Sequence, residues 1–335
     1  MDRQGKEKDR PMAKTHKEWE KPLAELEEGI AKLRELARKE NDSAKREALE
    51  VKIKEFEDRR DRYVDVMYAN LGPWEKVLVA RAERRPYTLD YVQAIFTNFT
   101  ELQGDRRGFI DNAIIGGPAM LDGEPVMIVG HQKGRNIQER QMRNFGMAKP
   151  EGYRKAIRLF DMAERFRMPV ISFVDTPAAD PGVESESRGI SEAIAAGMFK
   201  MFELTVPTVA VVIGEGGSGG AIGIAASSRV LMLEHSIYSV IPPEGCAAIL
   251  WRAPERGADA AKALQLTAQS AKEYGLIDEI VPEPKGGAHR DWVESAGLVK
   301  GAIVRNLDAL SGIPAERIRE ERYRKFRNMG MYQAA

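Results

Sequence analysis

One glycine cluster constrains the fold of this chain more than any other feature. Residues 206–213, VPTVAVVI, form an apolar, β-branched run of the kind found in buried strands. The next residues, GEGGSGG from Gly214 to Gly220, hold five glycines and one serine, and the small residues AIGIAASS follow. Glycine allows close approach of the backbone, and the first N–H groups of a helix have no partner within it. The pattern therefore predicts a strand, a tight turn and a helix, with bare backbone at the turn.

A dinucleotide-binding loop is the first interpretation of this cluster. Gly214, Gly216 and Gly219 match G-x-G-x-x-G after a strand, and Glu234 follows about twenty residues on, where a ribose-binding acid would be placed. Against this interpretation, the helix after the loop is short and built of small residues. The loop also lies two-thirds along the chain, with no second mononucleotide-binding half behind it.

A serine nucleophile is the second interpretation. Gly216, Ser218 and Gly220 match G-x-S-x-G, and Asp278 and His289 follow in the order found in hydrolases. A triad requires hydrogen-bond contact between the serine and the histidine, and the sequence does not show that His289 reaches Ser218.

In the third interpretation no side chain carries the chemistry. Backbone N–H groups at the start of a helix, together with the helix dipole, stabilise negative charge on an oxygen. Each such donor contributes about 3 to 4 kcal/mol to transition-state stabilisation. Close packing of the helix on the strand would also require small residues. The letters of the motif leave all of these alternatives open.

From about residue 86 onward, the sequence indicates an α/β fold. Apolar runs such as EPVMIVG (124–130) and PVISFVD (169–175) alternate with helical patterns such as PEGYRKAIRLFDMAERFRM (150–168). The helical pattern near the C-terminus, GIPAERIREERYRKFRNMG (312–330), is highly charged, and we expect it at the surface or against a partner.

A charged helical extension precedes this part of the chain. Residues 18–40 and 44–72 carry apolar residues at helical spacing, separated by the turn and N-cap residues NDS. We therefore expect a helical hairpin extension over residues 1–75. Residues 76–335 then form one α/β domain with a C-terminal helix.

Charge and cysteine content narrow the function. Lys plus Arg and Asp plus Glu both number 51, so no net field attracts the chain to nucleic acid or to an anionic membrane. No segment has about 18 uninterrupted apolar residues, and the opening MDRQGKEKDRPM lacks the apolar core of a signal peptide. The single cysteine, Cys246, excludes an internal disulfide and a thiolate zinc site built by this chain alone. These features predict a cytoplasmic protein that holds no metal.

Seven separated segments share their order and spacing with one known family. They are RPYTLDYV (85–92), GHQKGR (130–135), RNFGMAKPEGYRKAIRL (143–159), VDTPAADPG (174–182), IGEGGSGGA (213–221), PEGCAAILW (243–251) and GLIDEIVPEPKGGAHR (275–290). Together they resemble the α subunits of bacterial acetyl-coenzyme A carboxylase carboxyltransferases. The resemblance extends over roughly residues 18–330 and is far more specific than any single glycine motif.

The resemblance implies a crotonase-like fold of stacked ββα units behind the helical extension. It also implies an α2β2 assembly with a carboxyltransferase β subunit, which in the family carries a four-cysteine zinc site. Neither chain would be active alone. The other implied partners are a biotin carboxylase and a biotin carboxyl carrier protein, and no cofactor is expected to be bound covalently to this chain.

The family reaction requires two oxyanions to be held. Carboxybiotin on the carrier protein releases carbon dioxide, and the biotin ureido anion takes a proton from acetyl-coenzyme A (acetyl-CoA). The enolate then attacks the carbon dioxide to give malonyl-CoA, in the first committed step of fatty acid biosynthesis. By resemblance, the backbone amides of Gly219 and Gly220 form the oxyanion hole on the biotin side, and a Gly-Gly pair of the β subunit forms the other.

Further substrate-binding positions surround this hole. In the glycine cluster and the loop after the preceding strand they follow from the resemblance, whereas the polar residues of HQKGR could meet coenzyme A phosphates or the carrier, with ordinary loop surface as the alternative. The positions are Gly216, Gly217, Ser218, Ala178, Ala179, Gly182, His131, Lys133 and Arg135.

The loop DTPAADPGVESESRG departs from the family pattern D-T-P-G-A-Y-P-G-V-G-A-E. Ala178 replaces a glycine, Asp180 replaces an aromatic residue, and Glu184 with Ser185 replaces Gly-Ala. Two added carboxylates would oppose an enolate if both faced the pocket. Either they face solvent or the chemistry of the pocket has changed.

Two alternative functions follow from these observations. The chain could be a crotonase-type hydratase or a hydrolase that acts alone. It could also be a catalytically altered, α-like scaffold for another acyl-CoA carboxylase.

Overall fold

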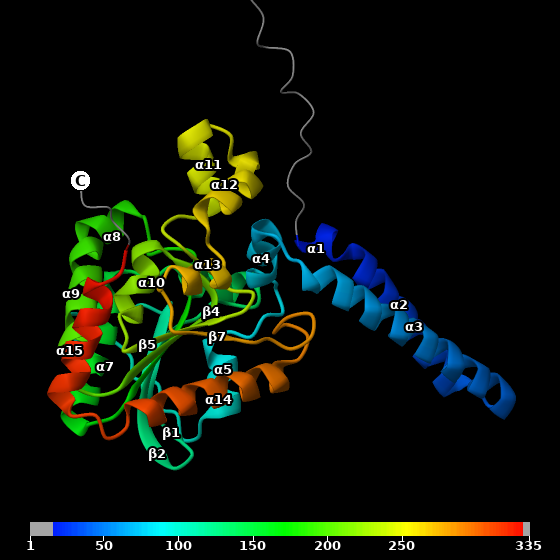
Figure 1. The fold of residues 1–335 in the computed structure, drawn as a ribbon, viewed down its shortest axis with the longest axis horizontal. Coiled ribbons are helices and arrows are strands. Elements are labelled where there is room, and N and C mark those ends of the chain that lie inside the picture. Colours follow the sequence, from blue (N-terminus) through cyan, green and yellow to red (C-terminus); the bar gives the residue numbers. More distant parts are fainter. Residues whose placement is uncertain (1–15, 331–335) are drawn as a thin grey trace, which may run out of the picture.

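The computed structural model describes residues 16–330, and a seven-stranded sheet forms its core (Figure 1). The hydrogen-bonded order is β1-β2-β3-β4-β5-β7, and β6 also pairs with β4. β1 and β2 are antiparallel, whereas the other pairings are parallel. The strands are β1 (Ile114–Leu121), β2 (Glu124–His131), β3 (Val170–Thr176), β4 (Thr208–Gly217), β5 (Arg229–Leu233), β6 (Ile237–Ser239) and β7 (Glu279–Val281).

Local chemistry explains this topology. Asp122 and Gly123 both have positive φ angles, 50° and 92°, which is the two-residue turn that joins twisted antiparallel strands. β3 and β4 are buried at every position, as expected for parallel strands covered on both faces. Strands that follow one another in the chain lie side by side from β1 to β5, so the chain winds in one direction through strand and helix layers.

Helices cover both faces of the sheet (Figure 1). On one face, α7, α9 and α10 bury Tyr153, Phe160, Met201 and Ile224. On the other face, α5 and α14 pack residues such as Tyr91 and Ile303. The helices are α1 (His16–Trp19), α2 (Lys21–Lys39), α3 (Ser43–Ala69), α4 (Pro73–Ala80), α5 (Thr88–Ile95), α6 (Ile137–Met142), α7 (Pro150–Phe166), α8 (Val183–Ser187), α9 (Ile190–Glu203), α10 (Ser218–Ala225), α11 (Pro243–Trp251), α12 (Gly257–Leu264), α13 (Ala268–Glu273), α14 (Trp292–Leu310) and α15 (Ala315–Arg327). Two 3₁₀ turns lie at Asn144–Gly146 and Pro254–Arg256.

The helical hairpin α2–α3 extends away from the body of the molecule (Figure 1). The carboxylate of Asp42 accepts hydrogen bonds from the N–H groups of Ala44 and Lys45, so the N-cap predicted at NDS is confirmed. At its base, Arg290 of the body donates to Glu20 and Glu27. The first 15 residues of the predicted extension lie outside the described residues.

The C-terminal helix α15 is mostly exposed, in agreement with the expectation of a surface or partner-facing helix. Only Ile318 and Arg322 are buried, and the guanidinium of Arg322 has a specific role inside the chain. It donates to the carbonyl oxygens of Met201, Leu204 and Val206 at 2.6, 2.7 and 3.1 Å. These carbonyls belong to the end of α9 and the segment after it, so Arg322 supplies the donors that the end of that helix lacks.

Among residues 16–330, none of the helices combines the length and the apolar composition needed to cross a bilayer.

Candidate active site

The predicted strand, turn and helix are present at the glycine cluster. β4 ends at Gly217 and α10 begins at Ser218, whose φ of 52° lies in the left-handed region. This conformation is strained for a serine, and the contacts around Ser218 have to stabilise it. No side chain among residues 16–330 caps the start of α10, so the open amides of its first turn are not covered by a capping oxygen.

Two glycines of the cluster are packed against the backbone of the loop after β3. A Cβ on Gly217 would lie 1.9 Å from the carbonyl oxygen of Pro177. A Cβ on Gly220 would lie 2.6 Å from the carbonyl carbon of Ala178 and from the nitrogen of Ala179. These distances are too short for any side chain, so the two loops fit together only with glycine at both positions.

Two further glycines are packed against side chains. A Cβ on Gly214 would lie 2.3 Å from Oδ1 of Asp175, and one on Gly216 would lie 2.7 Å from Cδ2 of Tyr238. Close packing therefore accounts for four of the five glycines, which the sequence could only list as an alternative.

Gly219 differs from the other four. A Cβ there would lie 3.4 Å from Cδ1 of Ile194, an ordinary contact, and the residue is half-buried. Packing does not require a glycine at this position. An approach of a ligand to the backbone would require one.

Both added carboxylates of the altered loop after β3 have partners within the chain. Oδ2 of Asp180 accepts a hydrogen bond from Oγ of Ser185 at 2.5 Å. Glu184 is exposed and pairs with Arg188 and Lys149. Of the two possibilities raised by the sequence, Glu184 faces solvent, and Asp180 is occupied within the loop. Gly182 is half-buried beside Asp180, where a Cβ would lie 3.3 Å from the same Oδ2.

His131 is buried, and Arg135 is paired with another residue of the chain. His131 is buried, with no exposed surface, and burial lowers the pKa of its imidazole to about 3, with a contribution from Lys133. Arg135 pairs with Asp90 and lies over the ring of Tyr87, 3.9 Å from its centroid. His131 thus offers no surface to coenzyme A phosphates in this chain, and the guanidinium of Arg135 already has a carboxylate partner.

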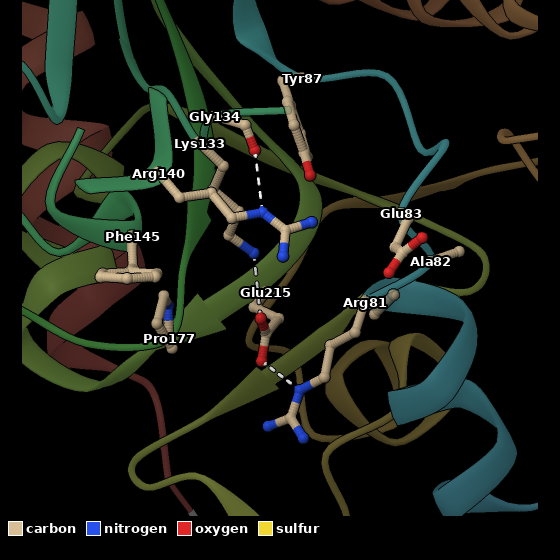
Figure 2. Close-up of a pocket in the computed structure, with 11 residues that line it drawn as sticks. Arg81, Ala82, Glu83, Tyr87, Lys133, Gly134, Arg140, Phe145, Pro177 and Glu215 are labelled. Atoms are coloured by element: carbon tan, nitrogen blue, oxygen red, sulfur yellow. Dashed lines mark hydrogen bonds and ion pairs between the residues drawn. The ribbon is translucent and has the colours of Figure 1, made fainter. Parts of the chain in front are cut away.

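Lys133 belongs to a cluster of five charged residues that the sequence did not indicate. Its Nζ lies 2.8 Å from Oδ1 of Asp175 and 3.0 Å from Oε1 of Glu215. Arg81 reaches Glu215 at 2.7 Å (Figure 2). The same guanidinium reaches Glu244 at 2.5 Å. Burial would raise the pKa of Glu215, but the charges of Lys133 and Arg81 lower it to about 2. We call these five residues the charge cluster.

One signal in the sequence could have found this cluster. Lys133, Asp175 and Glu215 each lie at or just after the carboxyl end of β2, β3 and β4, and such ends meet at one edge of a parallel sheet.

A cavity of about 300 Å³ adjoins the charge cluster (Figure 2). Arg140 donates from Nε to the carbonyl oxygen of Gly134 at 3.3 Å and lies between Tyr87 and Glu215 in the view. Pro177 and Glu215 line both this cavity and a smaller one that Gly216 and Gly217 also line. The lining residues are Ala80, Arg81, Ala82, Glu83, Tyr87, Lys133, Gly134, Arg140, Phe145, Pro177 and Glu215.

The structure excludes a Ser-His-Asp triad at this loop. His289 Nε2 lies 3.4 Å from Glu20 at the base of the hairpin. Asp278 accepts from the N–H of Val230 and pairs with Lys325. The strand order also differs from the doubly wound order of dinucleotide-binding folds, in which the chain returns after its third strand to the other side of the first strand.

Among the described residues, no group of three or more His, Cys, Asp or Glu side chains is arranged to hold a metal ion. Cys246 is buried beside Ala247 and Ala260.

The chain is similar to known proteins over nearly its whole length. Residues 16–330 match the family model described as acetyl co-enzyme A carboxylase carboxyltransferase-like. The acetyl-coenzyme A carboxylase carboxyl transferase subunit alpha of Geobacter metallireducens is 54% identical over 94% of this chain and 97% of that protein. The protein of the same name from Vibrio parahaemolyticus is 52% identical over 93% of this chain and 98% of its own length.

Two solved structures share the fold at low sequence identity. The transcarboxylase 12S structure has a TM-score of 0.55 at 16% identity, over 76% of this chain and 44% of that chain. A Pseudomonas malonate decarboxylase hetero-tetramer in complex with coenzyme A has a TM-score of 0.56 at 18% identity, over 70% and 91%. The predicted crotonase-like α/β fold is confirmed by these structural neighbours. The chain belongs to the acetyl co-enzyme A carboxylase carboxyltransferase-like family.

Proposed function

We propose that this chain is the α subunit of a biotin-dependent acetyl-CoA carboxyltransferase, which forms malonyl-CoA for fatty acid biosynthesis in the cytoplasm. The observation that carries the proposal is identity above one half to an α subunit of that name, over nearly the full length of both proteins. In this proposal, residues 214–220 at the junction of β4 and α10, called the glycine loop below, supply the backbone donors that such a function needs.

The reaction moves a carboxyl group between two substrates. The N–CO2 bond of carboxybiotin breaks, and its electrons remain on the ureido group as an oxyanion. That anion removes a proton from the methyl group of acetyl-CoA, and the enolate carbon forms a new bond to the carbon dioxide released. Biotin leaves neutral and ready to be carboxylated again.

In this proposal the amides of Gly219 and Gly220 hold the ureido oxyanion, while a β subunit holds the thioester enolate. Each amide donor stabilises the transition state by about 3 to 4 kcal/mol. The loop around Ala178 and Ala179, together with Gly216, Gly217 and Ser218, forms the wall of the biotin site. The two departures at Asp180 and Glu184 do not oppose the reaction, because one carboxylate is hydrogen-bonded and the other is exposed.

A partner subunit is supported by an apolar surface next to the loop. Val240, just after β6, and Ile249 and Leu250 on α11 expose 74%, 72% and 63% of their surface. The neighbouring residues Ile241 and Pro242 line the small cavity beside Gly217. Contiguous patches of exposed apolar side chains, unlike single exposed residues, mark interaction sites. We assign the surface to a β subunit, which carries the family's zinc site, in an α2β2 enzyme served by a biotin carboxylase and a biotin carboxyl carrier protein.

Reconstitution tests the proposal. The chain is mixed with its β subunit, a carboxylated biotin carrier and acetyl-CoA, and malonyl-CoA is measured beside the products of propionyl-CoA and longer thioesters. We expect malonyl-CoA only when both subunits are present. Hydration or hydrolysis of a thioester by the chain alone would favour a crotonase-type enzyme, and no product from any thioester with the β subunit would favour a scaffold.

A further inference from the structure

The hydrogen-bond ladder between β3 and β4 is interrupted at the start of the glycine loop. Val174 of β3 pairs with Val212 of β4, but the next pair is Thr176 with Gly216. Asp175 therefore faces three residues of β4, Ile213 to Glu215, and the ladder is interrupted there. Bulges of this kind re-aim a strand and are common beside active sites.

Charged side chains replace the hydrogen bonds that the bulge removes. The carbonyl oxygen of Ile213 accepts from Nε of Arg85 at 2.6 Å. The N–H of Glu215 donates to Oδ1 of Asp175 at 3.0 Å. Arg85 and Asp175 are both buried, so these bonds are protected from competition by water.

Lys133 connects the two sides of the bulge. It lies just after β2, the strand on the far side of β3 from β4. Its ammonium contacts the same Oδ1 of Asp175 that accepts from Glu215, and it also contacts the carboxylate of Glu215 itself. One cation thus fixes the carboxyl ends of three adjacent strands to one another.

The position of Lys133 makes it a poor ligand for a substrate anion. The side chain is 15% exposed and already has two carboxylate partners. Burial would lower the pKa of Lys133, but the charges of Asp175 and Glu215 raise it above its ordinary value, so the ammonium stays charged. Its stem also packs on Gly146, where a Cβ would lie 2.8 Å from Cγ of Lys133.

We infer that Lys133 is a positioning residue: by bridging Asp175 and Glu215 it holds the β4 bulge, and so aims the amides of residues 216–220 at the reacting oxygen. The inference rests on the proposed function for what those amides do. It assigns Lys133 to the geometry of the loop and not to the binding of coenzyme A.

A charge-balanced variant separates this role from simple neutralisation of buried acids. Lys133→Met alone leaves two buried carboxylates with one fewer cation and can destabilise the chain for that reason. Lys133→Met/Asp175→Asn removes one charge of each sign, keeps an acceptor for the N–H of Glu215, and leaves Glu215 paired with Arg81. The matched control is Lys300→Met/Asp122→Asn, which removes an exposed ion pair at the β1–β2 turn.

Hydrogen exchange of the full-length chain reads the geometry without any assay of activity. In the charge-balanced variant we expect amides of residues 213–221 to exchange at least about tenfold faster than in the unaltered chain, because the loop opens locally. Segments such as α14 keep their protection, and the control variant exchanges like the unaltered chain throughout. Unchanged exchange over 213–221 would overturn the inference, whether or not the chain proves to be a carboxyltransferase.

Kinetics with the β subunit supply the second measurement. We expect kcat of the charge-balanced variant to fall about tenfold or more while KM for acetyl-CoA stays within about threefold, since a small misplacement of catalytic groups costs turnover. A rise in KM at constant kcat would make Lys133 a substrate ligand and overturn the inference. An inactive unaltered enzyme would count against the proposed function, and hydrogen exchange would still decide the role of Lys133.

Discussion

The glycine loop and the N-terminal hairpin use charged residues and glycine in opposite ways. At the loop, Lys133, Asp175 and Glu215 are largely buried and contact one another across three strands. On the hairpin, pairs such as Lys32 with Glu28 are exposed along one helix. A Cβ on Gly217 of the loop would lie only 1.9 Å from the carbonyl oxygen of Pro177, so no side chain fits there. A Cβ on Gly29 of the hairpin would lie 3.7 Å from Phe56, which is an ordinary contact.

The two regions differ in how strongly their backbone geometry depends on single side chains. Exposed ion pairs contribute little to the free energy of folding because solvent screens them. A buried pair that loses one partner leaves an uncompensated buried charge, which destabilises the fold strongly. The loop is therefore sensitive to single changes, and the hairpin tolerates them. Four predictions test this contrast.

The largest effect is expected from a methyl group at the tightest glycine. Gly217→Ala forces the loop away from the carbonyl oxygen of Pro177. We expect the reconstituted rate of carboxyl transfer to fall at least about a hundredfold, the size of a lost oxyanion donor. Gly29→Ala, the matched change on the hairpin, keeps the rate and stabilises the chain by about 0.5 to 1 kcal/mol. Equal rates for the two variants would break the contrast.

Gly219→Ala sharpens the contrast, because its Cβ meets only an ordinary contact with Ile194. The free energy of unfolding should stay within about 1 kcal/mol of the unaltered chain, since alanine suits a helix. Carboxyl transfer should nevertheless fall about tenfold or more, because the methyl group obstructs the approach to the amide. Gly297→Ala on α14, where a Cβ would meet nothing within 4 Å, is the control. Full activity of Gly219→Ala would remove this amide from the mechanism.

Acid denaturation should report the buried carboxylate of the loop. The pKa of Glu215 is about 2 in the folded chain, against an ordinary 4.5. Since the folded value is the lower one, the stabilisation is complete above pH 4.5 and is lost as the pH falls toward 2; it amounts to roughly 3 kcal/mol. In Glu215→Gln, the free energy of unfolding measured by urea denaturation should no longer show this decrease between pH 4.5 and pH 2.

The buried imidazole of His131 supplies an internal reference for that experiment. Its pKa is about 3 against an ordinary 6.5, so its stabilisation is lost as the pH falls from 6.5 toward 3, and that loss persists in Glu215→Gln. If the stability of Glu215→Gln fell below pH 4.5 just as it does in the unaltered chain, Glu215 would not be the buried, paired carboxylate described above.

The smallest effect is expected on the hairpin. Arg34 pairs with Glu57 across α2 and α3, and the arginine is 57% exposed. Arg34→Ala should cost less than about 1 kcal/mol in urea denaturation and leave carboxyl transfer unchanged. A loss of rate with the biotin carrier, at unchanged stability, would place the hairpin in contact with the reaction and end its role as the tolerant region.

Local patterns in the sequence predicted the elements of the fold. The apolar runs at 169–175 and 206–213 became β3 and β4, and NDS became the N-cap of α3. The turn at Ser218 also lies where the glycine cluster indicates a break between strand and helix. Such features depend on neighbours in the chain, and a single sequence carries that information.

Contacts between distant residues could not be predicted in the same way. Nothing in the letters HQKGR shows that Lys133 meets Asp175 and Glu215, because the contact depends on which strands are adjacent. Arg154 and Lys155 lie on the charged helical pattern 150–168, and nothing in that pattern shows that Lys155 donates to the carbonyl oxygen of Asp111 or that Arg154 pairs with Asp105. Charged side chains buried with partners look in sequence like charged side chains in water.

The amides of Gly219 and Gly220 can be observed directly. The α chain, labelled with ¹⁵N-glycine and assembled with its β subunit, is titrated with biotin, and Gly219→Ala identifies one of the two resonances. We expect a saturable shift of both amide signals, with those of Gly29 and Gly297 unmoved. Unshifted signals from Gly219 and Gly220 at saturating biotin would contradict the claim that this loop holds the ureido oxygen.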